Sequence, residues 1–80
     1  MQTIIIDDYL KNGILIEKEF RKIINNINWK NFENENVLIK GCSEFIIPTW
    51  AYLLITAKLV RYAKNIYYGD LKSPIMIYKS

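Results

Sequence analysis

The chain has 80 residues, of which 51% are hydrophobic and 14% aromatic, and its formal net charge is +3. This length supports one hydrophobic core and excludes a second domain, and the apolar content excludes a disordered chain. The basic residues are scattered from Lys11 to Lys79 without forming a cluster, so we expect no nucleic-acid binding.

The first half of the chain predicts a strand followed by a helix. The β-branched run 3–6 predicts the strand, and Asn12-Gly13 predicts a turn. Residues 14–16 predict either a second strand or the lead-in to the helix. From Glu17 the spacing becomes helical, and the predicted apolar face holds Phe20, Ile23, Ile24 and Ile27.

The second half predicts a βαβ unit and a final edge strand. The uninterrupted apolar run 37–39 is typical of a strand covered on both faces. Pro48 suits the first turn of a buried helix, because its missing N–H has no partner there in any case. Residues 65–69 predict the next strand, parallel to the first across a right-handed crossover, and 75–78 predict the edge strand.

These elements indicate a single α/β domain over residues 1–80. We expect a small mixed sheet of three to four strands with two helices, containing one right-handed βαβ unit. The apolar stretch 45–57 is shorter than the roughly 20 residues of a membrane span, so we expect no membrane association. The single cysteine and an N-terminus without a secretory signal favour the cytoplasm.

The composition excludes several kinds of catalytic and metal site. There is no histidine, which removes Ser-His-Asp and Cys-His catalysis, and one cysteine alone makes neither a zinc site nor an iron–sulfur site. We therefore expect no bound cofactor or metal. The chain is more consistent with a non-catalytic protein than with an enzyme, although its residues leave the question open.

Cys42 is the candidate reactive residue, at the predicted carboxyl end of strand 37–39. Ligands and reacting groups of α/β sheets collect at that end. One interpretation is a small buried side chain that closes the strand. The other is a thiol that carries a persulfide or senses redox state, which requires exposure and a pKa lowered by Lys40 or a helix terminus.

The neighbours of Cys42 also carry functional groups. Ser43 and Glu44 are candidates for a donor and a general base, but such a pair more often begins a loop by bonding its own backbone. Asp70 follows the predicted neighbouring strand, and a carboxylate close to Cys42 raises the pKa of the thiol. Trp50 and Tyr52 fit either core packing, which we favour, or an aromatic platform for a partner.

The segments from Gly41 to Tyr52, with Pro48-Thr49-Trp50-Ala51-Tyr52 at their centre, and from Tyr62 to Leu71 resemble the uncharacterised Bacteroidetes family called domain of unknown function 2480. The resemblance implies a shortened member that corresponds to one of two related halves, and it marks Pro48, Trp50 and Tyr52 as motif residues. It also implies a second cysteine where this sequence has Lys72, so a two-cysteine function within one chain is not expected.

The leading functional expectation is a non-catalytic accessory or protein-interaction module. The resemblance implies a link to iron–sulfur cluster assembly, because genes of the family tend to lie beside those of the SUF assembly system, whose components are then the expected partners. A member that corresponds to one half is also expected to form a homodimer. The alternatives are a single-cysteine sulfur or redox carrier acting through Cys42, and an anion-binding helix face formed by Lys58, Arg61 and Lys64.

Overall fold

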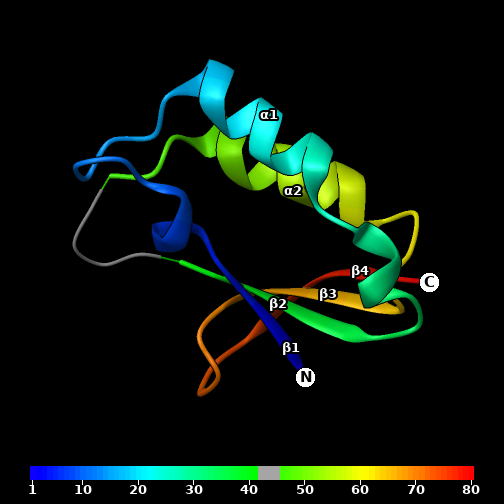
Figure 1. Ribbon diagram of the computed structural model, residues 1–80. Coiled ribbons are helices and arrows are strands. Elements are labelled where there is room, and N and C mark those ends of the chain that lie inside the picture. Colours follow the sequence, from blue (N-terminus) through cyan, green and yellow to red (C-terminus); the bar gives the residue numbers. More distant parts are fainter. Residues whose placement is uncertain (42–45) are drawn as a thin grey trace.

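A four-stranded mixed sheet forms the base of the molecule in the computed structural model, which describes residues 1–41 and 46–80. The strands lie in chain order: β1 (Gln2–Ile5), β2 (Asn36–Lys40), β3 (Asn65–Gly69) and β4 (Ile75–Lys79). The first three are parallel and β4 is antiparallel to β3 (Figure 1). The predicted parallel pair and the predicted last edge strand are both confirmed.

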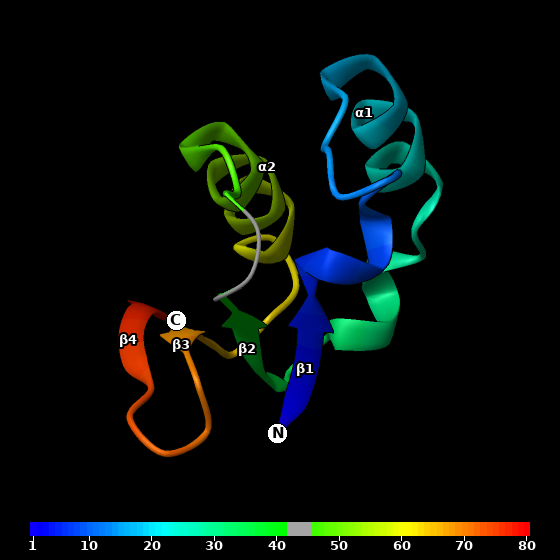
Figure 2. The same ribbon diagram turned by 90° about the vertical axis from the view of Figure 1, so that its left-hand side faces the viewer.

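Two helices pack side by side on one face of this sheet, α1 (Glu17–Asn26) and α2 (Thr49–Leu59), as Figure 2 shows. Short 3₁₀ turns, Ile6–Tyr9 and Trp29–Phe32, flank α1 on its way from β1 to β2. The opposite face of the sheet carries no helix. The predicted α/β fold with two helices is therefore confirmed, and it has the form of two layers.

The core lies between the helices and the sheet. Phe20 and Ile24 of α1 and Ala51, Ile55 and Leu59 of α2 turn their buried side chains toward β-branched residues of the strands. Burying this apolar surface is the main favourable term for a domain of this size. The core consists of Ile4, Ile6, Leu15, Phe20, Ile24, Trp29, Val37, Ile39, Ala51, Ile55, Leu59, Ala63 and Ile66.

Strand β2 is buried on both faces, as its apolar run predicts. Val37 and Ile39 belong to the core under the helices, while Leu38 points to the helix-free face because successive side chains alternate. Leu38 is nevertheless 0% exposed. Something other than a helix therefore covers it.

Residues 14–16 do not form a strand. Asn12 and Gly13 both have positive φ, 53° and 76°, and the tight turn they make is closed by two hydrogen bonds between Lys11 and Ile14. Pairing ends there, and Leu15 enters the core while Ile14 and Ile16 face outward. The strand that precedes α1 is instead β1. The fold therefore contains two β-helix-β units with parallel strands, one from β1 to β2 and one from β2 to β3. The sequence predicted only the second.

The basic helix face is also not formed, because α2 ends at Leu59, before Arg61 and Lys64. The N–H groups of Tyr62 and Ala63 both turn back to the Leu59 carbonyl, which brings Ala63 into the core. In the described part of the chain, no helix has the length and apolar content to cross a membrane.

Candidate functional site

The carboxyl ends of the three parallel strands meet at one end of the sheet. Ile5, Lys40 and Gly69 are register partners across β1, β2 and β3, and the N–H of Gly41 donates to the Gly69 carbonyl at 3.2 Å. In open α/β sheets this end is where ligands bind. The predicted site residues Cys42, Ser43 and Glu44 follow directly in sequence, and they lie outside the described residues.

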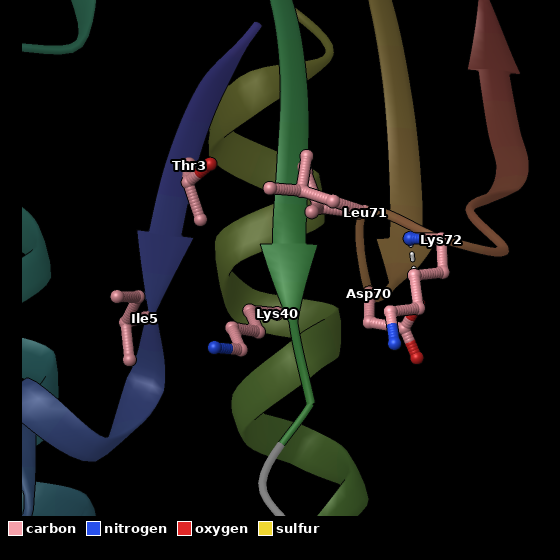
Figure 3. A pocket seen from close by; sticks show the side chains of 7 residues that line it. Thr3, Ile5, Lys40, Asp70, Leu71 and Lys72 are labelled. Atoms are coloured by element: carbon pink, nitrogen blue, oxygen red, sulfur yellow. Dashed lines mark hydrogen bonds between the residues drawn. The ribbon is translucent and has the colours of Figure 1, made fainter.

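A groove of about 590 Å³ lies on the helix-free face at this end of the sheet (Figure 3). We call it the carboxyl-end groove. The fully buried Leu38 lies beneath it, and Leu71, from the loop after β3, lies over β2 in the close view. The groove is lined by Thr3, Ile5, Leu38, Lys40, Asp70, Leu71 and Lys72.

The loop that carries Leu71 is held by Asp70. Oδ1 of Asp70 accepts hydrogen bonds from the backbone N–H groups of Lys72, at 2.8 Å, and Ser73, at 3.0 Å. Gly69 starts this loop with φ of +120°, a conformation that L side chains rarely adopt. The predicted site residue Asp70 thus shapes the loop that covers Leu38 and lines the groove with part of its carboxylate.

The groove carries more positive than negative charge. Lys40 extends from β2 and Lys72 from the loop, on different sides of Leu71 in the close view. Neither ammonium group forms an ion pair with another described residue. In Figure 3 the ammonium group of Lys40 points toward Ile5, away from Asp70. The Asp70 carboxylate already accepts two backbone N–H groups through Oδ1.

A second groove, of about 530 Å³, lies on the other side of the sheet between α2 and β4. We call it the helix-side groove. It exists because α2 covers β2 and β3 but leaves β4 uncovered, as seen in Figure 2. It is lined by Ile39, Ile47, Thr49, Tyr52, Leu53, Thr56, Tyr68 and Ile77.

The helix-side groove has no charged residue in its lining, which combines four aliphatic residues with four that carry a hydroxyl group. Leu53 and Ile77, on its two sides, are 63% and 52% exposed. Ile75 is the register partner of Tyr68 and is also exposed, as is Ile46 next to Ile47. Exposed apolar side chains that form a contiguous patch commonly mark an interaction site.

The motif residues Pro48, Trp50 and Tyr52 have distinct roles in placing α2. Pro48 is the residue before the helix, and its carbonyl accepts the N–H of Ala51 at 3.0 Å. The Trp50 ring meets Phe20 of α1 edge-on, with centroids 5.9 Å apart. The Tyr52 ring meets Tyr68 of β3 edge-on at 5.1 Å, so α2 is fixed to both α1 and the sheet.

Core packing, the favoured interpretation of Trp50 and Tyr52, is confirmed, because both are partly buried against the core. Tyr52 also lines the helix-side groove, whereas Asp70 lies in the groove on the opposite face of the sheet. The predicted candidates are thus divided between two surfaces.

Sequence reasoning missed most of the residues that line the two grooves. One available signal was the continuous apolar run of β2, which requires a cover for Leu38 on the face without helices, and Leu71 is the exposed leucine in the nearest loop. Among the described residues, no group of three Cys, Asp or Glu side chains is placed to hold a metal ion.

The chain is a small two-layer α/β domain with a groove on each side of a mixed sheet. The family model described as "Protein of unknown function (DUF2480)" matches residues 1–79. The chain therefore belongs to the DUF2480 family. No curated protein and no solved structure matches it.

Proposed function

We propose that the chain is a non-catalytic accessory module that binds a protein partner through the helix-side groove and the adjoining edge of β4. The observation that carries this proposal is the uncharged groove between α2 and β4, bordered by the exposed side chains of Leu53 and Ile77. The partner surface that fits it is an extended apolar segment.

The edge of β4 supports an extended partner. Among the described residues no strand pairs with the outer side of β4, so its backbone N–H and C=O groups face outward there. An added strand takes up such groups, and its alternate side chains fill neighbouring pockets. Because the groove lining has no charge, apolar side chains of that strand suit it best.

The proposed process is iron–sulfur cluster assembly, and the proposed partners are components of the SUF system. This part rests on the gene neighbourhood that the family resemblance implies. A second copy of the chain, or another cytoplasmic protein, is the competing occupant of the same surface. The experiment therefore has to separate these partners.

The test measures binding of purified SUF components to the intact chain, with solution size measured in parallel. Leu53→Lys is expected to weaken binding at least tenfold, because it places a charge in the groove. Ile14→Lys is the matched control, because Ile14 is also 63% exposed but lies in the turn before α1. It is expected to bind as the unchanged chain does.

Two results would overturn the proposal. One is the absence of binding to every SUF component, and the other is an equal loss in Leu53→Lys and Ile14→Lys. A dimer in the unchanged chain that Leu53→Lys dissociates would assign the surface to a second copy and remove the link to assembly components.

The second candidate function is a single-thiol sulfur carrier acting through Cys42. It is supported by the position of the preceding residues Lys40 and Gly41 at the carboxyl end of β2. In the carrier step the Cys42 thiolate attacks the outer sulfur of a donor persulfide. The sulfur–sulfur bond of the donor breaks, the donor leaves as a thiolate, and Cys42 becomes the persulfide.

Thiol-labelling rates of the folded chain, measured against pH, test the carrier. A carrier labels readily near neutral pH, accepts sulfur from a small persulfide donor, and loses this acceptance in Cys42→Ser while the fold persists. Labelling that occurs only on unfolding would overturn it.

A further inference from the structure

We propose that the carboxyl-end groove binds a small organic anion, with an apolar body against the exposed side chain of Leu71 and a terminal phosphate or carboxylate within reach of Lys40 and Lys72. The site is on the helix-free face of the sheet and is separate from the helix-side groove. The proposal does not depend on the proposed function.

The size and lining of the groove suit a small molecule. Its volume of about 590 Å³ falls within the roughly 300–1,000 Å³ of small-molecule sites. Leu38 is fully buried although no helix covers its face, so the loop after β3 already encloses part of the space. Thr3 and Ile5 of β1 form the wall across from that loop. An apolar body therefore finds accessible apolar contacts on Leu71 and Ile5.

The charged side chains of the groove favour an anionic ligand. The ammonium groups of Lys40 and Lys72 line the groove and have no ion pair with another described residue. The opposing carboxylate of Asp70 already accepts two backbone N–H groups through Oδ1. The groove therefore favours a ligand of negative charge, in keeping with the net charge of +3 of the whole chain.

The groove lies at the carboxyl ends of the parallel strands. Ile5 and Lys40 end two parallel strands and are register partners, and Asp70 directly follows the end of the third. Residues from separate strand ends thus converge on one space, as in the ligand sites of open α/β sheets. A groove elsewhere on the helix-free face would lack this convergence.

The test titrates the isotope-labelled full chain with hexyl phosphate and follows amide shifts by NMR. Inorganic phosphate and hexanol are the comparison probes, because each supplies half of the ligand. Hexyl phosphate is expected to shift the amides of Leu38, Lys40 and Leu71 saturably and to bind more tightly than either half. Leu71→Ser is expected to weaken the binding of hexyl phosphate but not the binding of inorganic phosphate.

Charge variants separate the site from general attraction to a basic protein. Lys40→Gln with Lys72→Gln is expected to weaken binding about tenfold, given the modest strength of exposed ion pairs. Lys22→Gln with Lys30→Gln removes the same charge elsewhere and is expected to leave affinity nearly unchanged. Asp70→Asn keeps the acceptor oxygen and removes the opposing charge, so it is expected to tighten binding about two- to fivefold.

Equal weakening in the two double variants would overturn the proposal, and so would hexyl phosphate shifts confined to other surfaces. Binding to vesicles of phosphatidylglycerol without binding to hexyl phosphate would also overturn it, because the occupant would then be a lipid surface.

Discussion

The hydroxyl group of Tyr68 occupies the space beside Gly41, where a Cβ atom would lie 3.3 Å from Tyr68 Oη. Tyr68 in turn meets Tyr52 of α2 edge-on. The backbone at the end of β2 and the packing of α2 on the sheet are therefore linked through one ring. A side chain at position 41 would disturb the wall of the helix-side groove.

We predict that Gly41→Ala destabilises the chain by about 1 kcal/mol, the lower end of the cost of overpacking, because the partly buried Tyr68 ring has to move slightly. In a Tyr68→Phe background the hydroxyl that meets the new methyl is gone, so the same change should cost less. Urea unfolding of the four chains measures this coupling. Equal costs of Gly41→Ala in both backgrounds would show that the two residues are independent.

Phe20 is predicted to be the most sensitive position of α1. Its ring is 1% exposed and meets Tyr9 edge-on at 6.0 Å and Trp50 at 5.9 Å. Phe20→Ala should cost about 3–5 kcal/mol, a large part of the total stability of a small domain. The control is Ile23→Ala on the same helix, where the residue is 36% exposed against 1% for Phe20. A thermal melt in which both variants lose the same stability contradicts the prediction.

Trp29 closes the end of α1 with a side-chain hydrogen bond. Its indole N–H donates to the Ile24 carbonyl at 3.0 Å in a buried environment. Trp29→Phe removes this donor, while the Ile24 carbonyl keeps the N–H of Ile27 at 3.3 Å, so the expected cost is about 0.5–1.5 kcal/mol. Hydrogen exchange should rise at the amides of the last turn of α1. Trp50→Phe, which retains an aromatic ring against Phe20, should leave those amides unchanged; unaltered exchange in Trp29→Phe would refute the role of the bond.

Tyr9 is expected to make the fold sensitive to alkaline pH. Burial raises the pKa of Tyr9 above its ordinary value of 10.0, and the nearby carboxylate of Asp8 adds to the rise. Because the folded state holds the phenol proton more tightly than the unfolded state, this contribution is complete below pH 10 and is lost as the pH rises through the folded pKa.

The measurement is the free energy of unfolding of the unchanged chain and of Tyr9→Phe between pH 8 and 11. The two proteins differ only in this hydroxyl group, so the difference between the two curves isolates Tyr9. The unchanged chain should lose more stability above pH 10 than Tyr9→Phe does. Parallel curves would contradict the prediction.

The features that the sequence predicted well are those with a local pattern. The change from alternating to helical spacing at Glu17 marks the start of α1, and the run 37–39 marks a strand buried on both faces. The pairing of β1 with β2 was missed because it depends on residues about 35 positions apart, which leave no periodic signal. The lining of the carboxyl-end groove depends on that pairing too, because Thr3 and Ile5 come from β1. Lys40 and Leu71 share a groove only because a loop returns across the sheet after β3.

The strand order has a consequence for how the chain folds. Each strand of the sheet pairs with the strand that precedes or follows it in sequence, so no pairing requires a later segment to insert between two earlier ones. The parallel pairings join residues 35 positions apart between β1 and β2 and 29 positions apart between β2 and β3, which costs more loop entropy than the short β3–β4 connection, but each strand finds its partner already synthesised. The sheet is therefore suited to growth in one direction during synthesis, with β1 and β2 pairing before β3 emerges and the antiparallel β4 added last.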